Sequence, residues 1–295
     1  MNTFWLLIVI LAHLFYALIF IIDKYIISRP LPHPIVYTFY IGILSICVWV
    51  LALFGFSFPS GYEILLILLA GISQVIGCIY FYKALNLGEV SRIVPFVGSF
   101  VAIFILILST LLIGERLSLQ QYIAFILLVL GSLIVSYKKK EIFQRSFGLA
   151  LFSALLFAIF WVITKYIFSD TTFVSGLIWV RTGVVFISLF LLLPRKNRQL
   201  IFKETAELKF KTIGFFSGGR ILSIAASFFM YLAVFLGSVT LANSLQGLQY
   251  AFVLILALLL FRKIPSLREE FSKKIIAQKV IAIILIGIGL FILII

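Results

Sequence analysis

Residues 84–91 read ALNLGEVS, and residues 233–240 in the second half of the chain read AVFLGSVT. Shared residues recur on both sides of this pair, in the same order along both halves. The further matches are Gly98 with Gly247, Lys24-Tyr25-Ile26 with Lys165-Tyr166-Ile167, Gly42 with Gly183, and Ile123-Ala124 and Gly131 with Ile281-Ala282 and Gly289. Order that is preserved along the whole chain predicts an internal repeat, with residues 1–140 as one copy and residues 141–295 as the other, in one membrane domain.

Composition places both copies in a membrane. Hydrophobic residues make up 64% of the chain and charged residues 12%, and the mean hydropathy is +1.26. These values lie far outside the range of soluble domains. Apolar runs recur at the length that a helix needs to cross a bilayer, about 20 residues. Because backbone amides in lipid must be hydrogen-bonded internally, these runs are expected to be helices.

We predict an all-α integral membrane protein with ten transmembrane helices in two inverted five-helix repeats. The predicted spans are Thr3–Ile22, Pro34–Leu53, Tyr62–Tyr82, Arg92–Ile113, Leu119–Tyr137, Phe147–Ile167, Phe173–Leu193, Ile213–Leu236, Val239–Phe261 and Ile276–Ile295. An odd number of spans in each copy forces the two copies into opposite orientations. Inverted repeats are typical of alternating-access transporters, whose substrate site lies near the midplane between the halves.

Basic residues are concentrated in alternate loops between the predicted spans. All but four of the 24 Lys and Arg residues lie in the loops after the first, third, fifth, seventh and ninth spans. The positive-inside rule puts those loops in the cytoplasm and both termini outside. This predicts a multi-pass protein of the plasma membrane, of the bacterial inner-membrane type. The basic loops would meet anionic headgroups, so membrane lipids rather than nucleic acid are the expected partners of this charge.

The sequence offers no catalytic or metal-binding pattern. It has no His-Glu-x-x-His, no Gly-x-Ser-x-Gly and no paired carboxylates inside a span, which argues against a membrane-embedded enzyme. The two cysteines, Cys47 and Cys78, and the two histidines, His13 and His33, have no metal-site spacing. No cofactor and no metal are expected.

The chain resembles a known family over essentially its full length, counting ten spans in two five-helix halves, and the motifs that carry the resemblance lie in the first half. Residues 84–95, the long apolar helix that follows, the turn Gly114-Glu115-Arg116-Leu117-Ser118 and a helix that carries Gly131 are similar to EamA-type carriers of the drug/metabolite transporter superfamily. The resemblance implies a small-metabolite carrier whose cavity is lined by the first, third and fourth helices of each half. The second half departs from the pattern, with Arg262-Lys263-Ile264-Pro265 in place of the Gly-Glu-Arg turn. Related carriers are often drawn with cytoplasmic termini, which is the alternative orientation.

Polar residues inside the spans gather on single helical faces. They are costly in hydrocarbon and usually face a cavity or a neighbouring helix, and spacings of three or four residues keep them on one face. The candidate substrate-binding residues are His13 and Tyr16 in the first span, Gln74, Cys78 and Tyr82 in the third, Trp161 in the sixth, Arg220, Ser223, Ser227 and Tyr231 in the eighth, and Asn243, Gln246 and Tyr250 in the ninth. The repeat aligns the set in the third span with the last three of the eighth.

Each candidate has a structural alternative. Serine and cysteine can be small packing residues, the amides can join helices by hydrogen bonds, and the tyrosines can belong to an interfacial belt. His13 can be a hydrogen-bonded structural residue, and Arg220 can extend toward the headgroups. Lys165, at the end of its span, is expected to be an interface anchor. Arg181 lies in a helix that tends to be peripheral in the family.

Charge inside the spans selects among substrates. All ten Asp and Glu residues lie at or beyond the span ends, so the midplane offers no carboxylate to a cation, whereas Arg220, and Arg181 as a second candidate, supply positive charge. The leading hypothesis is a secondary transporter of a small neutral or anionic metabolite, similar to an amino acid or an organic acid. A flippase-like carrier of an amphipathic or lipid-linked substrate, and a membrane scaffold, are the alternatives. If a proton is the coupling ion, it would have to use His13 or an end-of-span acid such as Asp23.

Overall fold

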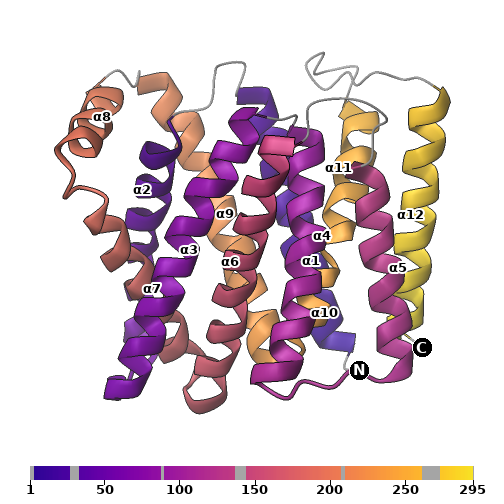
Figure 1. The fold of residues 1–295 in the computed structure, drawn as a ribbon, viewed down its shortest axis with the longest axis horizontal. Helices are drawn as coiled ribbons and strands as arrows, with labels where there is room; N and C mark the ends of the chain where they lie inside the picture. Colours follow the sequence, from indigo (N-terminus) through magenta and orange to yellow (C-terminus); the bar gives the residue numbers. More distant parts are fainter. Residues whose placement is uncertain are drawn as a thin grey trace.

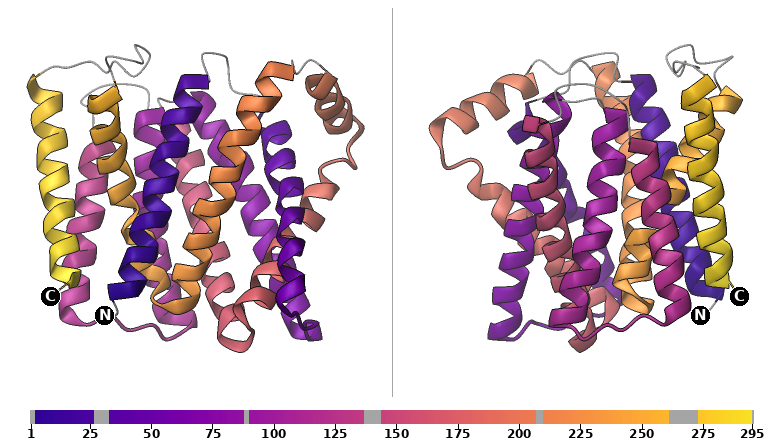
Figure 2. Two further views of the ribbon diagram at one scale, coloured as in Figure 1. Left: turned by 180° about the vertical axis from the view of Figure 1, so that it is seen from behind. Right: turned by 45° about the vertical axis from the view of Figure 1, so that its right-hand side comes forward.

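The computed structural model describes residues 3–26, 33–87, 90–136, 144–206, 210–260 and 273–294, and every regular element within them is a helix (Figure 1). In chain order the elements are α1 (Thr3–Ile26), α2 (Pro34–Leu44), the 3₁₀ helix η1 (Ser45–Phe54), α3 (Gly61–Leu87), α4 (Val90–Leu112), α5 (Leu119–Ser136), α6 (Gln144–Asp170), α7 (Phe173–Phe190), α8 (Arg195–Ala206), α9 (Phe210–Leu236), α10 (Val239–Ser244), α11 (Gln246–Leu260) and α12 (Lys273–Ile294). The long helices stand side by side, and the two ends of the chain lie at the same end of the bundle (Figures 1 and 2). We call this end the terminal face, and the opposite end the basic-loop face.

The chain is a multi-pass membrane protein by the length and composition of these helices. Among the described residues, six helical segments are long and apolar enough to cross a membrane: Pro34–Phe54, Gly61–Leu87, Arg92–Leu112, Arg145–Asp170, Phe173–Phe190 and Ala277–Ile294. Shorter apolar helical segments accompany them at Phe4–Ile19, Leu119–Val135 and Leu222–Leu236. The prediction of an all-helical membrane protein is confirmed at this level.

The helices follow the predicted spans closely, with three differences. The second span changes from an α-helix to a 3₁₀ helix at Ser45, and the ninth is divided at Leu245 into α10 and α11. The stretch predicted as the linker Pro194–Thr212 contains α8, which lies across the edge of the bundle next to α2 (Figure 1). This linker thus contains a helix of its own, in which Ile201 is buried. The other long linker, Arg262–Ile275, lies largely outside the described residues.

Two glycines allow α3 and α7 to touch at their backbones. A Cβ atom on Gly183 would lie 2.4 Å from the carbonyl oxygen of Ile67, and one on Gly71 would lie 2.5 Å from the carbonyl oxygen of Gly183. Small residues permit this close approach, which gives helices in lipid their van der Waals contact. The crossing fixes the depth of α7, and therefore of Arg181, two residues before Gly183.

A second glycine contact joins α5 to α12, which lie side by side (Figure 2). A Cβ atom on Gly131 would lie 3.0 Å from the carbonyl oxygen of Ala282, and one on Gly289 would lie 3.1 Å from that of Ala124. The sequence matches align Gly131 with Gly289 and Ala124 with Ala282. The two contacts are therefore the same contact made in both directions.

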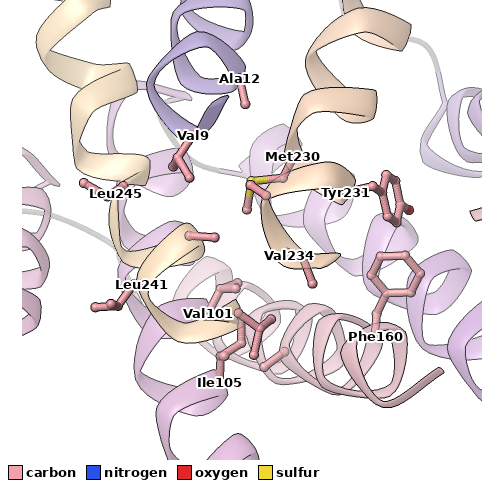
Figure 3. Packing of buried hydrophobic residues seen from close by; sticks show 14 of the residues in the cluster. Val9, Ala12, Val101, Ile105, Phe160, Met230, Tyr231, Val234, Leu241 and Leu245 are labelled. Carbon is pink, nitrogen blue, oxygen red and sulfur yellow. The ribbon is translucent and has the colours of Figure 1, made fainter. Parts of the chain in front are cut away.

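Apolar side chains fill the interior where α1, α4, α6, α9 and α10 meet (Figure 3). The labelled residues of this cluster are Val9, Ala12, Val101, Ile105, Phe160, Met230, Tyr231, Val234, Leu241 and Leu245. The rings of Phe160 and Tyr231 meet edge to face with 6.3 Å between their centroids. Tyr231 thus packs in this core, and its ring also contacts the guanidinium of Arg181.

Gly183→Ala is expected to destabilise the protein, because its Cβ would meet the Ile67 backbone, which cannot rotate away. Overpacking of this kind costs about 1–3 kcal/mol, and a lower thermal unfolding midpoint in detergent would show it. Gly287→Ala in α12 is the matched control, since nothing lies within 4 Å of its Cβ. An equal midpoint for the two variants would contradict the close crossing.

Candidate functional site

Arg181 of α7 carries a positive charge within an apolar helix. Its guanidinium carbon lies 4.8 Å from the centre of the Tyr231 ring, and its Nη1 donates to Oγ of Ser45 at 3.4 Å. It also acts electrostatically on Tyr16 and Cys78. Among the described residues, no carboxylate lies within ion-pair distance of it. The guanidinium is held by a ring face and a hydroxyl, and keeps donors for a further acceptor.

Several predicted site residues lie around this guanidinium. The Tyr16 hydroxyl is 3.3 Å from Oγ of Ser227 and joins α1 to α9. Nε2 of Gln74 donates to Sγ of Cys78 at 3.8 Å along α3. The ring of Trp161 lies 5.1 Å from that of Tyr231. We call this set the Arg181 cluster; its members are Tyr16, Ser45, Gln74, Cys78, Trp161, Arg181, Ser227 and Tyr231.

Tyr250 bonds to α4, and Gln246 bonds to Tyr250. The Tyr250 hydroxyl donates to the carbonyl oxygen of Val94 at 3.0 Å and is hydrogen-bonded to Gln246. Gly98 makes room for both, because a Cβ there would lie 2.7 Å from Oε1 of Gln246 and 2.7 Å from the Tyr250 hydroxyl. Pro95, inside α4, removes one backbone donor. The pair therefore joins α11 to α4 next to that proline.

His13 and Asn243 lie at the short helix α10. Nε2 of His13 is 3.1 Å from the carbonyl oxygen of Ala242, which requires the proton on Nε2, and the buried Nδ1 has no hydrogen-bond partner. Nδ2 of Asn243 donates to the carbonyl oxygen of Val239 within the same helix, at 2.9 Å. The side-chain amide of Asn243 is thus hydrogen-bonded within α10 itself.

The remaining predicted site residues are Tyr82, Ser223 and Arg220. Tyr82 packs edge to face on Tyr37 of α2, with 4.5 Å between the rings. Ser223 is half-buried on α9. Arg220 belongs to α9, but its side chain is outside the part of the chain that the structure describes.

The structure brings Arg181, the second candidate for positive charge, together with Ser45, for which the sequence gave no prediction. The signal for Arg181 was present, because an arginine inside a span is rare unless it faces the protein interior. A hydroxyl such as that of Ser45 gave no signal of its own. In the described residues, no group of three His, Cys, Asp or Glu side chains could hold a metal ion.

Comparison with known proteins places the chain in a family. Residues 3–137 match the EamA-like transporter family. Through this first half, the chain belongs to the EamA-like transporter family. No curated protein sequence matches the chain. One crystal structure of a protein with 15% sequence identity matches with a TM-score of 0.68, over 99% of this chain and 98% of its own, which shows a common fold.

Membership makes this EamA-family chain a membrane transporter with a small-molecule substrate, and not an enzyme. The resemblance noted in residues 84–131 is thereby confirmed. The matched residues include α1 and α3, which carry Tyr16, Gln74 and Cys78. Arg181 lies beyond the matched residues, so its role must be argued from its surroundings.

The bond between Tyr16 and Ser227 is expected to couple α1 to α9 energetically. In a double-mutant cycle, Tyr16→Phe and Ser227→Ala should show a coupling of about 0.5–1.5 kcal/mol in unfolding free energy, the net value of one hydrogen bond. Denaturant unfolding in mixed micelles measures it. Tyr16→Phe combined with Ser153→Ala is the control and should be additive, because Ser153 bonds to the carbonyl oxygen of Gly77. Coupling near zero for the first pair would contradict the contact.

Proposed function

We propose that this EamA-family transporter is a secondary carrier that moves a small metabolite with an anionic group, such as an amino acid or an organic acid, by alternating access. The observation that carries the proposal is the guanidinium of Arg181, held on Tyr231 without a carboxylate partner in the described residues. Arg181 thereby binds the anionic group of the substrate, a role that the sequence predicted first for Arg220.

An unpaired charge in a low-dielectric interior is costly. Stacking on a tyrosine ring offsets about 0.5–2 kcal/mol, which is less than a paired anion supplies. A substrate carboxylate or phosphate can complete the site through two parallel hydrogen bonds, a geometry that arginine favours. A permanent cation would meet repulsion at the same place.

Aromatic rings next to Arg181 support a substrate that also has an organic body. Trp161 and Tyr231 lie 5.1 Å apart, and Phe168 packs on Tyr231 with 6.3 Å between the rings. Binding sites for small molecules are mostly apolar with a few oriented polar groups. Gln74 and Ser227 can orient a second polar group of the substrate, such as an ammonium.

The finer architecture is part of the proposal: ten spans in two inverted five-helix copies, residues 1–140 and 141–295. The reciprocal contacts of Gly131 with Ala282 and of Gly289 with Ala124 support it, because an axis that exchanges the two halves exchanges these contacts. The break at Leu245 supports it as well, since the repeat aligns this residue with Phe96, directly after Pro95.

Arg181→Gln is expected to abolish recognition of the anionic group. Purified protein is screened for thermal stabilisation, which reports binding to the folded state, with amino and organic acids and with their carboxamides, which lack the charge. Acids should raise the unfolding midpoint of the wild type, and their amides should not. In Arg181→Gln the response to acids should be lost, with transport at least about 10-fold weaker, because a charged hydrogen bond contributes about 1.5–3 kcal/mol.

The matched control is Arg195→Gln, at an exposed arginine of α8, which should respond like the wild type. Arg181→Lys should retain part of the response, since it keeps the charge but loses the two parallel bonds. Equal stabilisation by an acid and its amide, or an unchanged response in Arg181→Gln, would contradict the proposal.

The orientation is a separate proposal, with the basic loops in the cytoplasm and both termini outside. A cysteine at Lys139, which lies outside the described residues, should resist a membrane-impermeant thiol reagent in intact cells. A cysteine at Arg116, exposed in the turn between α4 and α5 at the terminal face, should react. Both are placed in a chain without Cys47 and Cys78. The reverse labelling pattern would establish cytoplasmic termini.

A further inference from the structure

Lys165 turns to the end of a neighbouring helix instead of anchoring at the headgroups. Its Nζ donates to the carbonyl oxygens of Val234 at 2.9 Å, Phe235 at 3.3 Å and Gly237 at 2.7 Å. These carbonyls belong to the C-terminal end of α9, where backbone acceptors lack partners within the helix and positive charge is favoured. The three bonds use all three hydrogens of the ammonium.

A buried polar chain lies next to this ammonium. Oγ1 of Thr240 donates to Oε2 of Glu115 at 2.6 Å and lies 2.9 Å from Oγ of Ser109. Ser109 and Thr240 are fully buried. Glu115, in the turn between α4 and α5, acts electrostatically on Lys165. The Glu115 carboxylate is thus bound at the start of α10, three residues after Gly237, whose carbonyl oxygen accepts from Lys165.

Trp5 of α1 also contacts the turn between α9 and α10. Its Nε1 donates to the carbonyl oxygen of Ala233 at 2.7 Å, and a Cβ on Gly237 would lie 2.3 Å from that nitrogen. The turn between α9 and α10 is therefore held by α1 and the α4–α5 turn from the first half of the chain, and by α6 from the second. This enclosure lies at the terminal face, next to the apolar cluster of Figure 3.

We propose that the ammonium of Lys165 fills a monovalent-cation site built from the α9 carbonyls, and that this tethered cation holds the terminal face closed. Carbonyl oxygens replace the hydration shell of monovalent cations in the same way. Because the cation is part of the chain, closure needs no external sodium or potassium. The inference rests on the proposed alternating access, since only a carrier that opens this face has to close it.

Lys165→Ala should open the terminal face and create a site for a free cation. The readout is the native thiol of Cys78 in the Arg181 cluster, which is buried and becomes the sole thiol in a Cys47→Ser background. An impermeant thiol reagent is applied from each side of membrane vesicles, with the faces identified by labelling a cysteine at Arg116. From the terminal face, Lys165→Ala should raise the rate of Cys78 modification at least about 10-fold, a loss of about 1.4 kcal/mol of closure.

Methylammonium should restore protection of Cys78 in Lys165→Ala, because it supplies the missing donors. Tetramethylammonium, which has none, should not. Lys83→Ala, at an exposed lysine of α3, is the matched control and should react like the parent. Glu115→Gln should also raise the rate, and this variant tests the closure if Lys165→Ala fails to fold in both the presence and absence of methylammonium.

Unchanged Cys78 reactivity from the terminal face in folded Lys165→Ala, or in Glu115→Gln where that variant carries the test, would overturn the proposal. Raised reactivity that methylammonium fails to reverse would overturn the cation site. Neither result depends on acid binding, so a failure here is distinct from a failure of the Arg181 assignment.

Discussion

The stacking of the Arg181 guanidinium on Tyr231 is the interaction on which the interior of this transporter depends. A charge enclosed among apolar helices must be held by groups of the protein itself. Here a ring of α9 covers one face of the guanidinium, and Ser45 accepts at its edge. The position of Tyr231 follows in turn from its packing on Phe160 and Trp161. The charge therefore connects α7 to α9 and to η1, and these contacts leave some of its N–H donors unused.

The apolar runs were sufficient to predict the membrane-spanning helices, because the thickness of the hydrocarbon layer sets the length of the apolar segment that crosses it. They could not report how each backbone bonds within a span. The change to a 3₁₀ helix begins at Ser45 in a largely apolar stretch. The break at Leu245 lies among polar residues, from Asn243 to Gln249, which hydropathy averages into one apolar span. α8 was missed for the opposite reason. It is a polar helix at the edge of the bundle, so hydropathy does not detect it, and the burial of its Ile201 is seen only in the structure.

Helical periodicity predicted which residues share a face, but not what each face meets. It correctly grouped Gln74 with Cys78, which bond along α3. The same rule selected Gln246 and Tyr250, and the Tyr250 hydroxyl joins α11 to Val94 of α4. A helix-joining face and a ligand-binding face have the same spacing, so spacing alone does not separate them. Arg181 was the second candidate because its helix tends to be peripheral in the carriers that the chain resembles. The sequence does not show how closely α7 crosses α3. That depends on Gly183, whose backbone contact with α3 only the three-dimensional arrangement reveals.

The motif Lys-Tyr-Ile, which helped to indicate the repeat, acquires a physical reason from the bonds of Lys165. The repeat aligns Lys24 with Lys165, and Leu85-Asn86 at the end of α3 with Val234-Phe235 at the end of α9. The side chain of Lys24 lies outside the described part of the chain. In the proposed inverted arrangement, the two copies of this motif belong to opposite faces of the membrane. A carrier that closes its faces in turn needs one closing contact at each, and the proposed contact of Lys165 accounts for the terminal face.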